Sequence, residues 1–165
     1  NGYRSKELRP TNIGEFREPL GIPEIVKEGT DLTIVSYGST FNLCTAAVDQ
    51  LSQLGIEVEL IDIQTLLPFD INHSIVESLK KTSRLLIVDE DVSSGASSFI
   101  LDKILNEQGG YFHLDSAPVC LTAKDHRPPY GTDGDYFSKP SIEDIVEKAY
   151  EIMNDFDPES YPAIY

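Results

Sequence analysis

Residues 30–70 constrain the fold of this chain more than any other stretch. An apolar segment runs into a Gly-Ser-Thr turn, an amphipathic segment follows, and a second apolar segment ends at Leu67-Pro68. The order strand, helix, strand is a βαβ unit, and such units build parallel sheets. We therefore predict an α/β fold with a mostly parallel sheet.

Apolar spacing predicts the elements of this unit. The strands are expected at 32–37 and 56–63, with a helix between them that ends at Gly55, a residue suited to a helix C-terminus. Asp70 is expected to cap a short helix that follows. The inner face of that short helix is expected to consist of Ile71, Ile75, Val76 and Leu79.

Further elements are expected downstream. Residues 85–88 are continuously apolar, which is typical of a parallel strand covered on both faces. Another strand is expected at 118–122, with a helix between the two. A long loop over 123–139 then precedes a last helix, whose start at Ser141 and Asp144 resembles a capping box.

The chain divides into three regions by composition. Residues 1–28 are rich in Pro and Gly and lack a regular period, so we expect an extended arm. One edge of this arm is expected to dock on the domain, as a short strand. Residues 29–155 form the expected domain, and 156–165 a tail. Because the chain begins Asn1-Gly2 without Met, we expect a fragment or a processed product.

The formal net charge is −15, and the whole excess lies after residue 28. Nucleic acid and anionic membranes require a basic face, so both are poor partners. An acidic surface would suit a basic protein partner, or serve solubility alone. No apolar run approaches the roughly 18 residues that a membrane span needs.

Cys44 and Cys120 are too few and too far apart in sequence for a zinc knuckle or a disulfide framework. Each lies among apolar residues. We interpret both as buried free thiols in a reducing compartment, which predicts a cytoplasmic location.

The turn at 37–40 joins the carboxyl end of a strand to the start of a helix, where backbone N–H groups favour an anion. The turn has one glycine, and neither GxGxxG nor GxxxxGK[ST] occurs. A capped structural turn is therefore favoured over a phosphate or cofactor site.

Asp89, Glu90 and Asp91 follow the strand at 85–88, at the sheet edge where open α/β sheets place ligands. They could hold magnesium, or one could serve as an acid or base with a raised pKa. Because neighbours in an extended segment point to opposite sides, at most two would converge. A solvated or interface edge is favoured.

The loop at 124–131 concentrates His126, Arg127 and Tyr130 beside two prolines. Loops of this kind often carry function. A catalytic role for His126 is disfavoured, because no nucleophile or base partner is visible. Two interpretations stay open: contact with a partner or a substrate channel, and a plain surface loop. No Ser-His-Asp order or nucleotide fingerprint occurs, and we assign no catalytic, cofactor-binding or metal residue.

Several motifs together resemble a known family. They lie, in order, at 19–21, 26–38, 59–70, 81–90, 115–119 and 140–145. This pattern resembles the carboxyl-terminal domain of transketolases, and most of all the beta part of thiamine-diphosphate-dependent 2-oxo acid dehydrogenases. The resemblance covers residues 19–155.

The resemblance implies a three-layer α/β sandwich, used for subunit assembly in the decarboxylating first component of a 2-oxo acid dehydrogenase complex. That component oxidatively decarboxylates pyruvate or a branched-chain 2-oxo acid and passes the acyl group to lipoyl groups. Thiamine diphosphate and magnesium would lie between the two preceding domains, so the isolated domain should be inactive. Expected partners are other domains or subunits of the enzyme in a homo-oligomer, and the basic subunit-binding domain of the dihydrolipoyl acyltransferase.

The chain departs from the family pattern at two places. Residues 95–99 read Gly-Ala-Ser-Ser-Phe where Gly-Gly-Phe is common, and 125–130 differ from the usual Asp-Thr-Pro-x-Pro. These departures suggest a branch with fused alpha and beta parts. Two alternatives stay open: the same domain of a transketolase or deoxyxylulose phosphate synthase, and a small acidic metal-binding or signalling module.

Overall fold

The computed structural model describes residues 11–131 and 133–163. Within them, strands form one sheet in the order β1-β3-β2-β4-β5. The strands are β1 (Glu24–Lys27), β2 (Leu32–Ser36), β3 (Val58–Asp62), β4 (Leu85–Val92) and β5 (Val119–Ala123). The helices are α1 (Gly38–Gln53), α2 (Ser74–Thr82), α3 (Ala96–Asp102), the π-helical η2 (Lys103–Glu107), the 3₁₀ turn η3 (Gly110–His113), α4 (Gly134–Ser138) and α5 (Ile142–Phe156).

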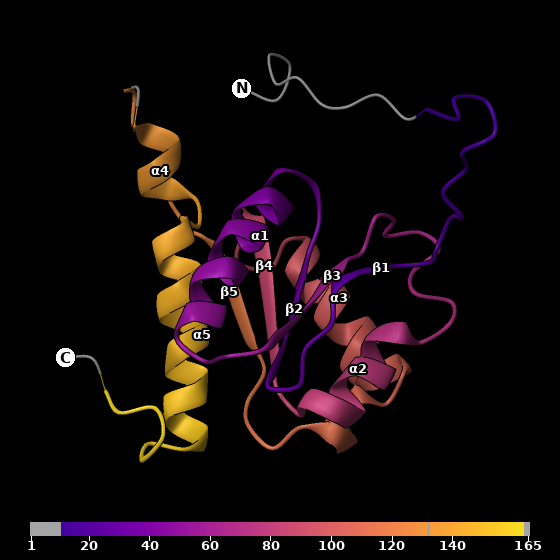
Figure 1. Cartoon of the computed structure of the whole chain (residues 1–165). Helices are drawn as coiled ribbons and strands as arrows, with labels where there is room; N and C mark the ends of the chain where they lie inside the picture. Colours follow the sequence, from indigo (N-terminus) through magenta and orange to yellow (C-terminus); the bar gives the residue numbers. More distant parts are fainter. Residues whose placement is uncertain (1–10, 132, 164–165) are drawn as a thin grey trace.

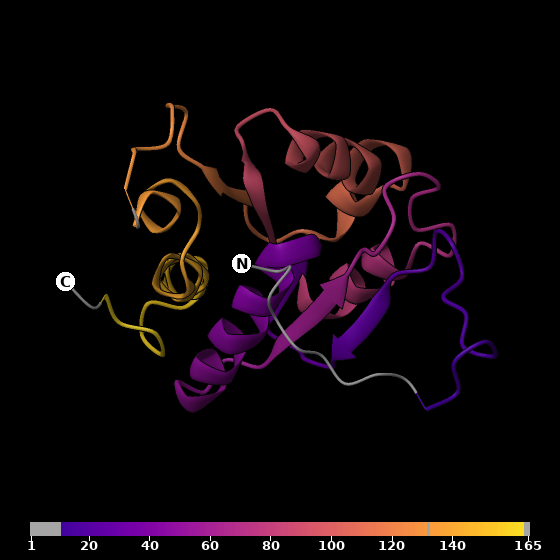
Figure 2. The same ribbon diagram turned by 90° about the horizontal axis from the view of Figure 1, so that it is seen from above.

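The sheet is parallel except at one edge. β3, β2, β4 and β5 run in the same direction, and β1 pairs with β3 antiparallel. Helices α1 and α5 cover one face, while α2 and α3 cover the other (Figures 1 and 2). The predicted three-layer α/β fold is confirmed.

Side-chain alternation along β3 explains why both faces of the sheet are covered. Val58 and Leu60 pack in the cluster with α1 and α5, whereas Ile61 and Ile63 pack in the cluster with α2 and α3. Since successive residues of a strand point to opposite faces, one strand supplies both cores.

Helix ends follow the expected chemistry at two places. Gly55 adopts φ +80° directly after the C-cap of α1, in the left-handed region that glycine enters without strain. At α5, the Ser141 side chain accepts from Asp144 N–H, and the Asp144 carboxylate accepts from Ser141 N–H. Both predicted helix termini are confirmed.

Two expectations about local structure were wrong. Ile71 was expected on the inner face of the short helix, but α2 begins three residues later at Ser74, and Ile71 is exposed. Asp70 still caps α2, because its carboxylate reaches forward to the N–H groups of Ser74 and Ile75. The expected loop at 123–139 contains the short helix α4.

The terminal segments also make defined contacts. Of the expected arm, residues 1–10 lie outside the described part, residues 11–20 are exposed, and β1 forms the docked edge strand. Of the expected tail, residues 164–165 are not described, and the Tyr161 ring meets the Tyr150 ring of α5 edge-on, with 6.2 Å between ring centroids. In the described ranges, no helix has the length and apolarity to cross a membrane.

Candidate functional site

Asp89 lies at the carboxyl edge of the sheet, on β4, and is fully buried. Its carboxylate accepts from the Tyr37 hydroxyl at 2.8 Å, from Ser97 N–H at 2.8 Å and from Asp91 N–H at 3.0 Å. Burial, and next the bond to Asp89, raise the pKa of the Tyr37 hydroxyl, so Tyr37 remains a donor. Asp89 thus ties the start of α3 to the end of β2.

Glu90 points to a different set of partners. Its carboxylate accepts from the Ser39 hydroxyl at 2.8 Å and from Lys139 Nζ at 3.1 Å. The hydrogen bond from Ser39, followed by that from Lys139, lowers the pKa of Glu90. Glu90 therefore connects the first turn of α1 to the segment between α4 and α5.

Asp91 is engaged within its own turn. Its Oδ1 accepts from Val92 N–H at 2.8 Å, and a Cβ at Gly95 would lie 2.4 Å from its Oδ2. The three adjacent carboxylates thus face three different sets of partners. Across residues 11–131 and 133–163, no group of three His, Cys, Asp or Glu side chains is placed to hold a metal ion.

The loop after β5 places its cationic side chains against aromatic rings. The Arg127 guanidinium lies over the Tyr130 ring at 4.5 Å, and Lys124 Nζ over the Phe137 ring at 4.1 Å. His126 Nδ1 lies 2.8 Å from the Arg127 carbonyl, which accepts from it, and its ring is 5.6 Å from Phe137. His126, Arg127 and Tyr130 are all exposed. Thr132 of this loop lies outside the described residues.

The structure brings the two predicted groups to the same edge of the sheet without joining them. Val92 of β4 pairs with Ala123 of β5, so both segments leave the sheet side by side. Within the described part, the hydrogen bonds and ion pairs of Asp89, Glu90 and Asp91 go to other residues than His126, Arg127 and Tyr130.

Sequence reasoning missed two residues of this edge, Ser39 and Lys139. Both contact Glu90, and both are about fifty positions from it in the chain, with separations of 51 and 49 residues. The local sequence around each residue points to no partner, so the sequence carries no signal for these pairs. Ser39 was noted as part of the turn at 37–40, without this role.

The hydroxyl groups of Ser36 and of the turn at 37–40 form hydrogen bonds with other groups of the protein. Thr40 Oγ1 donates to the Tyr37 carbonyl at 2.8 Å, and Ser36 Oγ lies 2.9 Å from the Val88 carbonyl. Together with the Ser39–Glu90 bond, these contacts give each hydroxyl a protein partner. The geometry is that of a structural turn.

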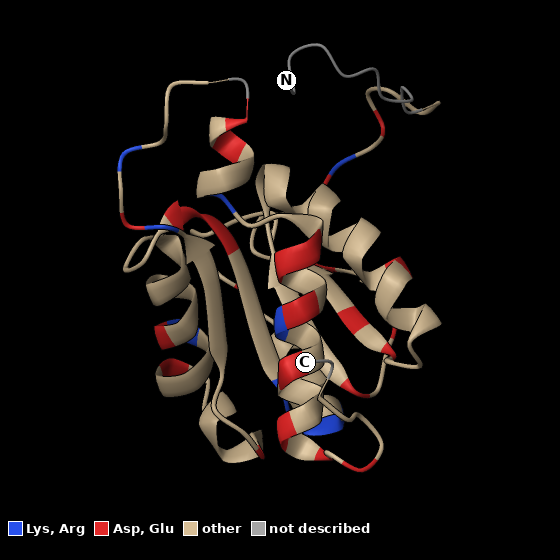
Figure 3. Ribbon diagram, turned by 90° about the vertical axis from the view of Figure 1, so that its left-hand side faces the viewer, with Lys and Arg blue, Asp and Glu red and all other residues tan. Residues whose placement is uncertain are grey.

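Four acidic residues form a stripe along the outer face of α5 (Figure 3). They recur at intervals of four residues and are all exposed, as Glu143, Glu147, Glu151 and Asp155. Like charges at this spacing destabilise an isolated helix. Glu151 pairs with Lys148 on the same helix, and the stripe as a whole is an acidic surface suited to a basic partner.

The two cysteines are free thiols, as predicted. Cys44 is fully buried, and burial raises the pKa of its thiol to about 12. Cys120 is half-buried rather than buried, and burial also raises the pKa of its thiol. Neither thiol has the lowered pKa of a reactive cysteine.

Comparison with known proteins places these features in a family. The model of the transketolase C-terminal domain matches residues 21–144. The pyruvate dehydrogenase E1 component subunit beta of Acholeplasma laidlawii is 37% identical over 87% of this chain and 43% of its own length. The mitochondrial 2-oxoisovalerate dehydrogenase subunit beta of Dictyostelium discoideum is 37% identical over 71% of this chain and 31% of its own length.

A solved structure shares the fold. It is described as a split-gene transketolase, an inactive β4 tetramer, and aligns with a TM-score of 0.64 over 80% of this chain and 41% of that chain. Its sequence identity is 24%, so this likeness concerns the fold alone.

The fold and its carboxyl edge define an α/β domain of the transketolase type. The chain belongs to the transketolase C-terminal domain family, and its curated relatives are E1 beta subunits of 2-oxo acid dehydrogenases. It spans less than half the length of those relatives.

Proposed function

We propose that this chain is the assembly domain of the beta part of a 2-oxo acid dehydrogenase first component, acting on pyruvate or a branched-chain 2-oxo acid. The observation that carries the proposal is the 37% identity to the Acholeplasma laidlawii subunit over 87% of the chain. The reaction is oxidative decarboxylation, with transfer of the acyl group to lipoyl groups of the complex.

The proposal places thiamine diphosphate and magnesium in parts of the enzyme outside this chain. A magnesium ion needs several free oxygen ligands, and thiamine diphosphate brings two phosphate groups. The described carboxylates at the sheet edge do not fit this need, because Asp89 and Glu90 accept hydrogen bonds from protein groups. No catalytic step is therefore assigned to a residue of this chain.

The role proposed for the sheet edge is to hold an interface in shape. Glu90 connects α1 to the segment before α5, and the loop that carries His126, Arg127 and Tyr130 lies between β5 and α4. Exposed aromatic and arginine side chains are typical of protein interfaces. This edge would face other subunits or the substrate channel of the assembled enzyme, a homo-oligomer.

The second proposed partner is the basic subunit-binding domain of the dihydrolipoyl acyltransferase. The acidic stripe on α5 supports this proposal, because an acidic surface attracts a basic partner and speeds their encounter. Substituting Glu147 and Glu151 with Gln should weaken that binding at low salt. Unchanged binding by calorimetry would assign the partner to another surface.

We also propose a cytoplasmic location.

A transketolase or deoxyxylulose phosphate synthase is a weaker candidate. The transketolase structure shares the fold, but the curated relatives above are dehydrogenase subunits. An assay separates the two candidates. The full-length enzyme should release CO₂ from a 2-oxo acid in the presence of thiamine diphosphate and magnesium, and turnover of a ketose phosphate instead would refute the proposal.

A further inference from the structure

Three exposed aliphatic side chains gather where the arm enters the domain, and we call Leu20, Leu67 and Ile71 the arm-entry patch. They are 69%, 78% and 57% exposed, respectively. Gly21 joins the arm to the loop between β3 and α2: its N–H donates to Thr65 Oγ1 at 2.7 Å, and its carbonyl accepts from Ile71 N–H at 2.9 Å. A Cβ at Gly21 would meet the Ile71 side chain at 3.2 Å.

The loop that carries the patch is firmly anchored. Phe69 is buried and meets the Phe99 ring edge-on, with 6.1 Å between centroids. The Asp70 carboxylate caps α2, and its carbonyl accepts from Gln108 Nε2 at 3.0 Å. Leu67 and Ile71 are thus held outward by a built loop.

The backbone of this loop adopts unusual conformations. Gln64, Asp70 and His73 have φ of 58°, 31° and 57°, in the left-handed region that disfavours residues with a side chain. Such a conformation is unfavourable and persists where the surroundings enforce it. The surrounding structure therefore fixes the loop conformation that exposes the two aliphatic side chains.

The loop that carries Leu67 and Ile71 is depleted of charge. Residues 64–76 contain one charged side chain, Asp70, which is buried, although charged residues make up 25% of the chain. Loss of charge together with exposed aliphatic groups marks the centre of a protein interface.

We propose that the arm-entry patch is the surface on which the remainder of the E1 beta polypeptide packs, through an apolar face of the domain that precedes this one. This inference rests on the proposed function. The chain spans 43% and 45% of the length of two curated relatives, so more than half of such a subunit lies outside it.

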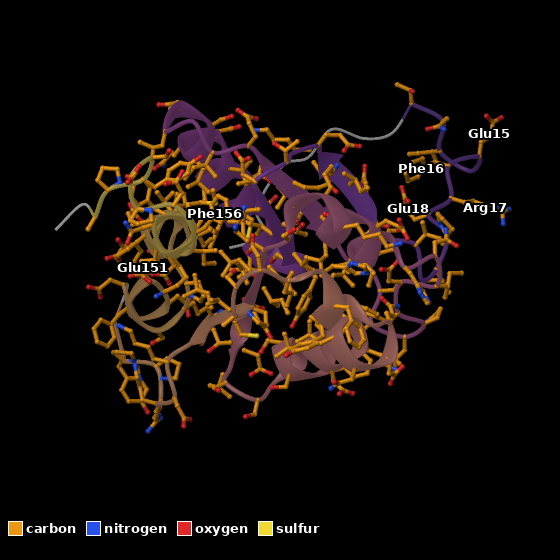
Figure 4. The ribbon with its side chains drawn as sticks, turned by 90° about the horizontal axis from the view of Figure 1, so that it is seen from below. Glu15, Phe16, Arg17, Glu18, Glu151 and Phe156 are labelled. Carbon is orange, nitrogen blue, oxygen red and sulfur yellow. The ribbon has the colours of Figure 1, made fainter. Side chains whose placement is uncertain are left out.

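The course of the arm indicates the same occupant. Residues 11–20 are exposed throughout and lead straight into Leu20 and Gly21. Phe16, on this arm, is 54% exposed and lies away from the helical layers (Figure 4). A preceding domain that packs on this side of the sheet would cover both Phe16 and the patch.

The test uses the full-length subunit with Leu67→Ser and Ile71→Ser together. Because the two substitutions remove apolar contacts with the covering domain, they should raise the rate of tryptic cleavage after Arg17 by about tenfold or more. Leu54→Ser is the matched control, since Leu54 is 49% exposed and follows the end of α1. The control should cleave like the wild type.

Hydrogen exchange provides a second readout that needs no variant. Amides of residues 66–72 should exchange at least about tenfold more slowly in the full-length subunit than in the 165-residue chain. Equal exchange, or equal cleavage of the double variant and the wild type, would overturn the proposal. The proposal would also be overturned if the 165-residue chain formed a dimer and the double variant were a monomer, because the occupant of the patch would then be a second copy. Failure of the proposed function gives a different result. In that case residues 66–72 are protected from exchange in the full-length subunit, but the enzyme releases no CO₂ from a 2-oxo acid.

Discussion

Asp70 and Asp89 are both fully buried carboxylates, and each accepts hydrogen bonds from backbone N–H groups at the start of a helix. A carboxylate at a helix N-terminus satisfies unpaired donors and interacts favourably with the helix dipole. Asp70, which was predicted as a cap, and Asp89, which was predicted at a solvated or interface edge, therefore share a structural role in this domain.

Replacing Asp70 with Ala should lower the free energy of unfolding by about 1–2 kcal/mol, because α2 loses the acceptor for two N–H groups. Urea denaturation followed by circular dichroism measures this loss. Asp70→Asn keeps one acceptor oxygen and should retain part of the stability. A variant with Ala that matches the wild type would show that Asp70 does not stabilise α2.

Glu59 is a buried carboxylate on β3 that pairs with Lys81 of α2. Burial opposes its ionisation, but hydrogen bonds from Lys81 and Ser78 prevail and lower the pKa of Glu59 from its ordinary 4.5. A lowered folded-state pKa contributes stability that is present above about pH 4.5 and is lost as the pH falls through the folded-state pKa.

Lys81→Met should therefore destabilise the protein at pH 7 by roughly 1–3 kcal/mol, since Glu59 is left charged without its partner. The difference from the wild type should shrink as the pH falls below about 4.5 and through the lowered folded-state pKa of Glu59, where its carboxylate is protonated. Lys80→Met is the control, because Lys80 pairs with the exposed Glu77. Urea unfolding at pH 7 and pH 4 measures both variants, and a pH-independent difference would contradict the pairing.

At the scale of elements, the sequence predicted the helices and strands that carry a local pattern. The strands at 32–37 and 85–88 and the capping box of α5 follow from alternation, apolar runs and one local motif. α4 escaped prediction because five residues carry no helical period, and its position depends on contacts such as Lys124 N–H to the Ser138 carbonyl. The Glu90 contacts depend on the tertiary fold in the same way.

The capping box predicts a measurable contribution of Ser141 to α5. Ser141→Ala removes the acceptor of Asp144 N–H and should cost about 1 kcal/mol of unfolding free energy. Ser160→Ala, in the segment after α5, is a control of the same chemistry at an exposed position. Thermal unfolding measures both, and equal melting temperatures of the two variants would argue against the cap.

At the scale of the whole molecule, the described surface divides into three regions with different chemistry. The sheet edge carries Glu90 and the aromatic-cationic loop, α5 carries an acidic stripe, and the arm-entry patch exposes aliphatic side chains. Each region suits contact with a protein, and the carboxylates of the sheet edge are occupied by internal bonds. This arrangement favours a domain that assembles an enzyme over one that performs its chemistry.

The central claim is that thiamine-dependent chemistry belongs to the rest of the enzyme. Titration of thiamine diphosphate with magnesium into the 165-residue chain, followed by calorimetry, tests this claim most directly. We predict no binding heat with this chain, against saturable binding with the full-length enzyme that decarboxylates a 2-oxo acid. Saturable binding of thiamine diphosphate by the 165-residue chain would contradict the account.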